Sequence, residues 1–175
     1  MNAVQLDRAV GVVLASAAGD ALGSQYEFGP ALAEDVTPQF GRGVFGHEIG
    51  EWTDDTSMAM PILRVLADGR ALEDSDALDE IVARWCEWSA TAKDVGVQTR
   101  GILSSLASTT AAETTSRTEQ QHRATGRSAG NGSLMRTGPV ALGYLDRDPA
   151  ELIAAAGRVA QLTHWEQDNV DACAL

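Results

Sequence analysis

Residues 52–69 carry the stretch that decides the fold: Trp52-Thr53-Asp54-Asp55-Thr56, continued by SMAMPILRVLADG. The apolar residues after the paired aspartates recur at three- and four-residue spacing, which is typical of an amphipathic helix. We expect this helix to run from Thr53 to about Asp68 and to be ended by Gly69. Pro61 lies inside it, where it removes one backbone hydrogen bond and predicts a kink.

The start of the same stretch also indicates chemistry. Asp54 and Asp55 put two carboxylates beside the hydroxyl of Thr53, and such oxygen donors suit a hard divalent cation such as Mg²⁺ or Mn²⁺. Helix capping is the alternative, because Thr is a good N-cap and acidic residues are stabilising in a first helical turn. Both interpretations remain open from these residues alone.

Helical periodicity continues on both sides, and we find no alternating pattern of the kind that predicts strands. The expected fold class is therefore all-α, with residues 1–175 in a single domain. Further helices are expected over 6–22, 77–89, 97–107, 133–145 (interrupted near Gly138-Pro139) and 149–163. We interpret residues 28–50 as a long irregular loop. Residues 108–127 are rich in Thr, Ser, Glu, Gln and Arg, and we expect them to form a mobile loop or a poorly ordered insertion.

The first expected helix carries a stripe of small residues at Gly11, Ala15, Gly19 and Gly23. Glycine costs about 1 kcal/mol in a helix interior, so the stripe needs a reason. We interpret it as a smooth face that lets another helix approach closely.

Composition narrows the function classes. The chain has 175 residues, 44% hydrophobic and 22% charged, and a net charge of −12. An acidic chain is a poor general partner for nucleic acid or anionic membranes, and no apolar run is long enough to cross a bilayer. Cys86 and Cys173 lie far apart and read as buried or free thiols. Without a signal-peptide pattern at the start, the expected setting is cytoplasmic.

Two further carboxylates, Asp20 and Glu27, are seven residues apart. If the first helix continues, they lie on one face, where they could serve a metal or act as a general acid or base. A solvated polar face is the alternative. Asp20 stands between two glycines in an otherwise apolar stretch, which makes it harder to assign to such a face.

Residues 128–133, SAGNGS, precede the apolar pair Leu134-Met135. Glycines let successive backbone N–H groups converge on an anion, so the loop could cradle a phosphate or diphosphate. A plain turn is the alternative, because Asn-Gly is a common turn pair. Arg136 could neutralise that phosphate or could be a surface arginine. His164 ends the last periodic segment, as a helix cap or as a polar contact in a cleft.

Taken together, these segments resemble the ADP-ribosylglycohydrolase family, which includes hydrolases of ADP-ribosyl-arginine and ADP-ribosyl-serine. The matching motifs, in the family order, are Gly19-Asp20-Ala21-Leu22-Gly23 with Glu27, Gly50-Glu51-Trp52-Thr53-Asp54-Asp55-Thr56, Gly130-Asn131-Gly132-Ser133-Leu134-Met135-Arg136 and Thr163-His164. Four ordered motifs are far more specific than any single one.

The resemblance implies an all-α fold with a cleft for two Mg²⁺ or Mn²⁺ ions and hydrolysis of the bond between ADP-ribose and an acceptor, either a protein side chain or a small molecule. It places Thr53, Asp54 and Asp55 at metal-ligand positions and Glu27 beside the scissile bond. The implied substrate-binding residues are Asp20, Ser128, Gly130, Asn131, Gly132, Ser133 and His164. A member that binds ADP-ribose without turnover, or that has a structural role, is the alternative.

The chain departs from the family pattern in two ways. Family members are usually longer and carry a second acidic cluster, Asp-x-Asp-Thr, which this sequence lacks. Pro61 also stands in a helix that normally lacks proline. The chain thus resembles the N-terminal portion of a member, and the expected partners include the C-terminal half or another copy. By itself the chain is expected to show no appreciable hydrolysis.

Overall fold

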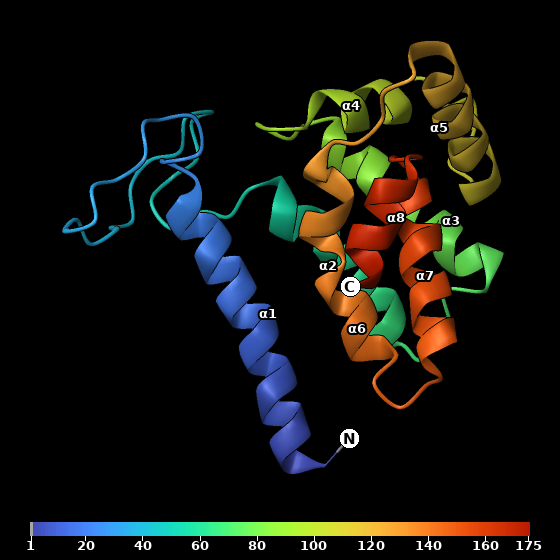
Figure 1. Ribbon diagram of the computed structural model, residues 1–175, viewed down its shortest axis with the longest axis horizontal. Helices are drawn as coiled ribbons and strands as arrows, with labels where there is room; N and C mark the ends of the chain where they lie inside the picture. The colour runs from blue at the N-terminus through green and yellow to red at the C-terminus, as the bar shows by residue number, and fades with distance from the viewer. Residues whose placement is uncertain (1) are drawn as a thin grey trace.

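The computed structural model describes residues 2–175, which form helices and no strand, so the all-α expectation is confirmed (Figure 1). The helices, in chain order, are α1 (Ala3–Gly23), α2 (Asp54–Ala67), α3 (Ser75–Ser89), α4 (Val97–Leu103), α5 (Ala111–Thr125), the 3₁₀ helix η1 (Asn131–Arg136), α6 (Gly138–Gly143), α7 (Pro149–Gln161) and α8 (Gln167–Ala174).

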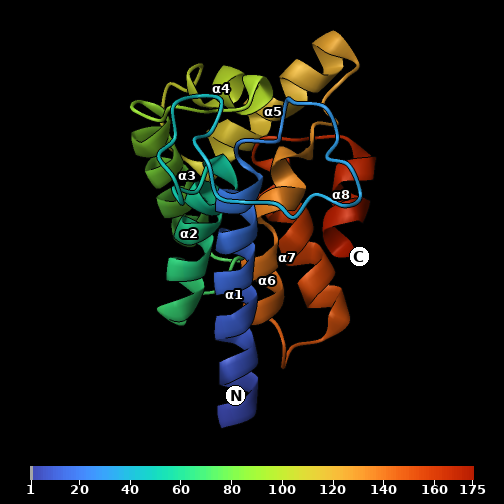
Figure 2. The same cartoon turned by 90° about the vertical axis from the view of Figure 1, so that its left-hand side faces the viewer.

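The core forms around α2, which packs against α3, α6 and η1, while α7 packs against α8 (Figure 2). Apolar side chains at helical spacing meet there because each helix turns one stripe inward. Fully buried members include Ile62, Val65, Ile81, Val82, Trp85, Val140 and Val159. The Trp85 indole N–H donates to the carbonyl of Met58 at 2.9 Å, so its buried polar atom is satisfied.

Helix α2 follows the sequence expectation closely. It begins after the N-cap Thr53, continues through the buried Pro61 and ends before Gly69, which has a φ of 77°. Glycine suits that left-handed conformation because it has no Cβ. The expected irregular loop before α2 is also present, since residues 24–53 contain no helix.

Helix α1 lies at the edge of the bundle, beside α2 and α6 (Figures 1 and 2). Of its 21 residues only Ala21 is buried. The expectation of close packing along the glycine stripe was wrong for the described part of the chain. At Gly11, Gly19 and Gly23, no atom of residues 2–175 outside the helix's own backbone lies within 4 Å of where a Cβ would stand.

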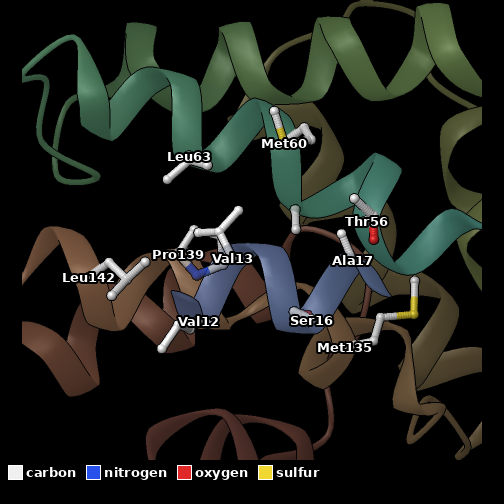
Figure 3. Close-up of a pocket in the computed structure, with 12 residues that line it drawn as sticks. Val12, Val13, Ser16, Ala17, Thr56, Met60, Leu63, Met135, Pro139 and Leu142 are labelled. Carbon is white, nitrogen blue, oxygen red and sulfur yellow. The ribbon is translucent and has the colours of Figure 1, made fainter. Parts of the chain in front are cut away.

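A different face of α1 borders an apolar pocket between α1, α2 and α6 (Figure 3). Val13 and Ala17 of α1 line it opposite Met60 and Leu63 of α2 and Pro139 of α6. The face of α1 that borders the bundle at this pocket therefore carries Val13 and Ala17 rather than the glycine stripe.

Residues 111–125 correct the expected loop over 108–127, because they form helix α5. Thr110 caps it by accepting from the N–H of Glu113, and Gly126 ends it at a φ of 63°. The hydroxyls of the buried Thr114 and Thr118 each donate a hydrogen bond to the carbonyl four residues earlier, at 2.6 and 2.9 Å. These bonds let a sequence poor in large apolar residues form a packed helix.

Two smaller differences concern helix ends. Helix α4 stops at Leu103 instead of continuing to residue 107, and α8 was not expected at all. Cys86 and Cys173 are free thiols, and Cys173 is buried. No helix within residues 2–175 is long and apolar enough to span a membrane.

Candidate functional site

Asp20 connects the end of α1 to the start of α2. Its carboxylate accepts from the backbone N–H of Thr53 at 3.0 Å and of Thr56 at 3.1 Å. Both threonine hydroxyls also donate to it, each at 2.6 Å. These bonds satisfy N–H groups that a helix start leaves unpaired, so Asp20 caps α2 from a different helix. A direct contact between Asp20 and a substrate stays a prediction.

The bond to Asp20 also determines which other contacts the hydroxyl of Thr53 can make. The side chain of Thr53 accepts no hydrogen bond from the N–H groups of α2, and its hydroxyl donates to Asp20. The oxygen lone pairs of Thr53 are then free to accept a cation. A capping bond from the Thr53 side chain is therefore not observed, whereas Asp54 and Asp55 do stand in the first turn of α2, as the capping interpretation also expects.

A cleft brings together residues from five separate segments. Its polar residues come from the turn after α1, the start of α2, residues 93–100 that lead into α4, the start of η1 and the turn between α7 and α8. Its polar lining comprises Glu27, Asp54, Asp55, Lys93, Asp94, Gln98, Thr99, Arg100, Gly130, Asn131, Gly132 and His164. An adjoining hollow is lined by Asp20, Glu27, Thr53, Asp55 and Asn131. Asp20 and Glu27 thus share a hollow, although α1 ends between them at Gly23.

Like charges are concentrated in this cleft. Burial is the main cause that raises the pKa of Asp55 to about 7, and the carboxylates of Asp20, Asp54 and Glu27 add to the increase. Burial, followed by the charge of Asp94, also raises the pKa of both Asp54 and Glu27. The pKa of Asp94 is raised by its own burial. A cation among these groups would relieve the repulsion that raises their pKa values.

Asp94 was not identified from the sequence. It stands between Lys93 and Val95 in a segment without helical periodicity, and nothing in that pattern distinguishes it from a surface acid. Only the folding of residues 93–96 against the start of α2 brings it to the cleft.

Thr53, Asp54 and Asp55 supply oxygen donors of the type that Mg²⁺ and Mn²⁺ prefer. Two carboxylates and one hydroxyl would suit at most one hard cation, whose remaining positions water would have to fill. Within residues 2–175, no group of three or more His, Cys, Asp or Glu side chains is arranged to hold a metal ion. The residues present therefore do not fit a pair of ions without further ligands.

The glycine loop is held from behind by side chains that the sequence did not reveal. Asn169 of α8 donates its amide to the carbonyl of Gly130 at 2.7 Å and to the hydroxyl of Ser133 at 2.9 Å. Gln98 of α4 donates to the carbonyl of Ser128 at 3.1 Å and of Thr163 at 2.7 Å. These bonds tie the loop to α4 and α8.

Two of the residues expected to bind substrate lie behind the loop. The N–H of Ser128 donates to Glu166 at 2.6 Å, and its hydroxyl pairs with Nδ1 of His122 at 2.8 Å. Ser133 is fully buried. Neither lines the cleft, whereas Gly130, Asn131 and Gly132 do. In this structure Ser128 and Ser133 bond to other parts of the protein, and a role of either residue in substrate binding stays a prediction.

His164 packs against the two glycines. A Cβ on Gly130 would stand 3.2 Å from Nε2 of His164, and one on Gly132 would stand 3.0 Å from Cε1. Larger residues would push the ring away, so the glycines are needed for this close approach. The histidine is 2% exposed and lines the cleft, which favours the cleft contact over a solvent-exposed helix cap.

Arg136 matches neither role considered for it, because it is fully buried. Its guanidinium lies 4.1 Å from the centre of the Trp85 ring and donates to the carbonyl of Val159 at 2.9 Å. It also donates to the hydroxyl of Thr163 at 2.7 Å. It is therefore part of the core beneath the cleft.

Several known proteins are similar to this chain. A family model described as ADP-ribosylglycohydrolase matches residues 1–175. The chain is 32% identical over 175 residues to the ADP-ribosyl-[dinitrogen reductase] glycohydrolase of Rhodospirillum rubrum, covering 95% of this chain and 54% of that protein. It is 28% identical over 173 residues to the ADP-ribosylarginine hydrolase Tri1 of Serratia proteamaculans, and the match covers 96% of this chain and 45% of that protein.

A third relative, the ADP-ribosylarginine hydrolase Tri1 of Pseudomonas putida, is 53% identical over 55 residues, 31% of this chain and 15% of that protein. A solved structure titled ADP-ribosylglycohydrolase-related protein complex aligns with a TM-score of 0.63 and 27% identity, covering 97% of this chain and 53% of that one. The chain thus spans about half the length of the relatives that it matches along most of its own length.

Proposed function

The chain belongs to the ADP-ribosylglycohydrolase family, and we propose that its cleft serves metal-dependent hydrolysis of the bond between ADP-ribose and an acceptor. The observation that carries the proposal is the arrangement of the cleft. Glu27, Asp54 and Asp55 line it together with the glycine loop and His164. Acidic groups for a cation and for proton transfer thus face a loop suited to a diphosphate.

Each side of the cleft has a separate task in this proposal. Gly130 and Gly132 line the cleft, where backbone N–H groups of the loop would stabilise the negative charge of a diphosphate. Glu27 manages a proton near the scissile bond, since burial and neighbouring carboxylates raise its pKa and favour proton uptake. The chain orients the ribose between these two sides.

Thr53, Asp54 and Asp55 would hold the cation, Mg²⁺ or Mn²⁺. When bound, the cation would bind ribose hydroxyls and polarise the reacting centre. Asp20 takes part indirectly, because it fixes the first turn of α2 and so the direction of all three donors.

We infer that the acceptor is arginine, because two of the relatives are named ADP-ribosylarginine hydrolases. The acidic lining around Glu27, Asp54 and Asp94 supports this choice, since a guanidinium is a cation and would be attracted by those carboxylates. The substrate would be an ADP-ribosylated protein or a small molecule that carries the same group.

We also propose that residues 1–175 without further ligands turn over little or no substrate. Two carboxylates and one hydroxyl hold a single ion loosely, whereas the family site is expected to use two. The further ligands would come from a C-terminal half like that of the relatives or from another copy of the chain. The shortage of donors favours ADP-ribose binding without turnover as the second candidate function.

A chimera tests the function while supplying the rest of a relative. Residues 1–175 would replace the matched portion of the Rhodospirillum rubrum glycohydrolase, and release of ADP-ribose from ADP-ribosyl-arginine would be followed with Mn²⁺ and with Mg²⁺. We expect metal-dependent turnover and a loss of roughly 100-fold in kcat/KM for Asp54→Asn. Asp76→Asn is the matched control, because its side chain is 80% exposed.

The outcomes separate the candidates. Full activity of the Asp54→Asn chimera contradicts the metal-ligand assignment. A folded chimera that binds ADP-ribose but never releases it from arginine supports the second candidate function. Robust turnover by residues 1–175 alone, free of any longer chain, contradicts the proposal that further ligands are needed.

A further inference from the structure

Three polar side chains form a continuous chain from the core to the cleft. Nη2 of Arg136 donates to Oγ1 of Thr163 at 2.7 Å, and that oxygen lies 2.8 Å from Nδ1 of His164. Arg136 and Thr163 are fully buried, and His164 is 2% exposed. Water therefore does not compete for these bonds from the core side.

The donor and acceptor roles in this chain can be derived. Arginine is always a donor, so the Thr163 hydroxyl accepts from Arg136. Its single hydrogen then needs an acceptor, and within residues 2–175 the only other hydrogen-bond partner of this oxygen is Nδ1 of His164. If Nδ1 instead carried the proton, the buried hydroxyl hydrogen would have no partner, at a cost of about 1–3 kcal/mol.

The opposite ring nitrogen points to the glycine loop. Nε2 of His164 stands 3.2 Å from the Cβ position of Gly130 and 3.3 Å from that of Gly132, and His164 lines the cleft with both residues. Since a neutral imidazole carries one hydrogen, an accepting Nδ1 places that hydrogen on Nε2. No protein group in the described part of the chain is hydrogen-bonded to Nε2, so its hydrogen is available to a ligand.

We propose that Arg136 and Thr163 are positioning residues that hold His164 as the neutral Nε2–H tautomer, so that it donates a hydrogen bond to a phosphate or ribose oxygen of ADP-ribose in the cleft. The identity of that ligand rests on the proposed function. The tautomer itself rests only on the contacts of Arg136, Thr163 and His164.

The charge of Arg136 strengthens this arrangement. Within residues 2–175 no carboxylate forms a salt bridge with the guanidinium, which is held by the Trp85 ring, by carbonyl and hydroxyl oxygens and by Sδ of Met58 at 3.8 Å. Its positive charge therefore acts on His164 unneutralised. Burial of the ring, followed by the charge of Arg136, lowers the pKa of His164 to about 3. At neutral pH His164 is thus a neutral donor and no proton source.

Nuclear magnetic resonance of ¹⁵N-histidine-labelled protein tests the tautomer directly. The chain has only three histidines, so His47→Gln and His122→Gln identify the His164 signals. In the parent protein at pH 7 we expect a protonated Nε2 and an unprotonated Nδ1. Thr163→Ser keeps the hydroxyl and should keep this pattern, whereas Thr163→Val removes it and should populate the Nδ1–H form.

Affinity for ADP-ribose, measured by calorimetry with Mg²⁺ on the same proteins, tests the donor role. We expect Thr163→Val to weaken binding about tenfold and Thr163→Ser to match the parent, which a loss of packing alone would not produce. If Thr163→Val does not fold, as judged by circular dichroism, Thr163→Ala takes its place.

A parent protein with protonated Nδ1 overturns the proposal, as does a Thr163→Val protein with unchanged tautomer and affinity. A changed tautomer with unchanged affinity overturns the donor role. If the parent binds no ADP-ribose, the proposed ligand is wrong, and the tautomer comparison still supports or overturns the positioning role of Arg136 and Thr163.

Discussion

Helices α1 and α3 join the bundle in opposite ways. Helix α3 buries five of its 15 residues, among them Ile81 and Trp85, whereas α1 buries one of 21. The clearest polar contact of α1 is the carboxylate of Asp20, which caps α2. Helix α3 is therefore held by the packed core, whereas α1 depends on the polar cap that Asp20 forms at the start of α2.

The largest expected difference concerns these two helices. Trp85→Ala should cost about 3–5 kcal/mol of unfolding free energy, because it empties the centre of the core and removes the ring beneath Arg136. Leu14→Ala on α1 should cost less than about 0.5 kcal/mol, since Leu14 is 64% exposed. Urea unfolding of both variants measures the contrast, and equal losses would show that α1 is packed as tightly as α3.

The pH dependence of the unfolding free energy tests the burial of His164. The pKa of His164 in the folded protein, about 3, lies below its value of 6.5 in the unfolded chain. As the pH falls below 6.5, the unfolded state takes up a proton at His164 that the folded state does not. The contribution of His164 to the free energy of unfolding is therefore fully present above pH 6.5 and is lost as the pH decreases toward 3. The loss should approach 1.4 kcal/mol per pH unit, roughly 2 kcal/mol by pH 5.

His164→Asn should remove that part of the pH dependence, because asparagine does not titrate. Urea unfolding at several pH values between 7 and 5 compares the slopes of the parent and the variant. Carboxyls with raised pKa values, such as Asp55, contribute equally to both proteins and cancel in the difference. Identical slopes would contradict a buried, neutral His164.

A substitution at Asp20 tests the polar cap that α1 forms at the start of α2. Asp20→Ala should lower the unfolding free energy by about 1–2 kcal/mol, because Thr53 and Thr56 lose their shared acceptor at the start of α2. Asp7→Ala is the control on the same helix, at an exposed position. If both substitutions have the same small effect, the start of α2 does not need the cap from α1.

Gly130→Ala should reduce affinity for ADP-ribose about tenfold, or ~1.4 kcal/mol, with a smaller effect on stability. The added Cβ would stand 3.2 Å from Nε2 of His164 and narrow the cleft. Gly101→Ala is the matched control, because its nearest contact is an ordinary 3.7 Å. Calorimetry that gives equal affinity for both variants would leave the loop as a plain turn.

The parts of the fold that the sequence predicted are those whose signals are local. Helix α2 has a Thr-Asp-Asp start, an apolar stripe and Gly69 at its end, and all of these signals can be read from consecutive residues, although Asp20 of α1 supplies the cap. Helix α5 lacks a wide apolar stripe, because Thr114 and Thr118 fill that role by bonding to carbonyls. Its Thr110-x-x-Glu113 start and its Gly126 end were local signals that composition outweighed.

The residues of the candidate site also fall into two groups, those that the sequence predicted and those that it did not. Glu27, Asp54 and Asp55 and the glycine loop were recognised as motifs, and the structure brings them to one cleft. Asp94, Gln98 and Asn169 were missed, because each contributes through a contact with a segment distant in sequence. Such contacts leave no periodicity in a single sequence. For the same reason, the positions of Ser128 and Ser133 behind the loop could not be foreseen.

The most direct test of the cleft is calorimetric titration of ADP-ribose into residues 1–175 with Mn²⁺, with EDTA, and with Mn²⁺ after Asp54→Asn combined with Asp55→Asn. We expect binding in Mn²⁺ that weakens at least tenfold in EDTA and in the double variant, because both conditions would remove the cation that we propose between the carboxylates and the ribose. Equal affinity in all three titrations, or no binding in any, would contradict a metal-dependent ADP-ribose site.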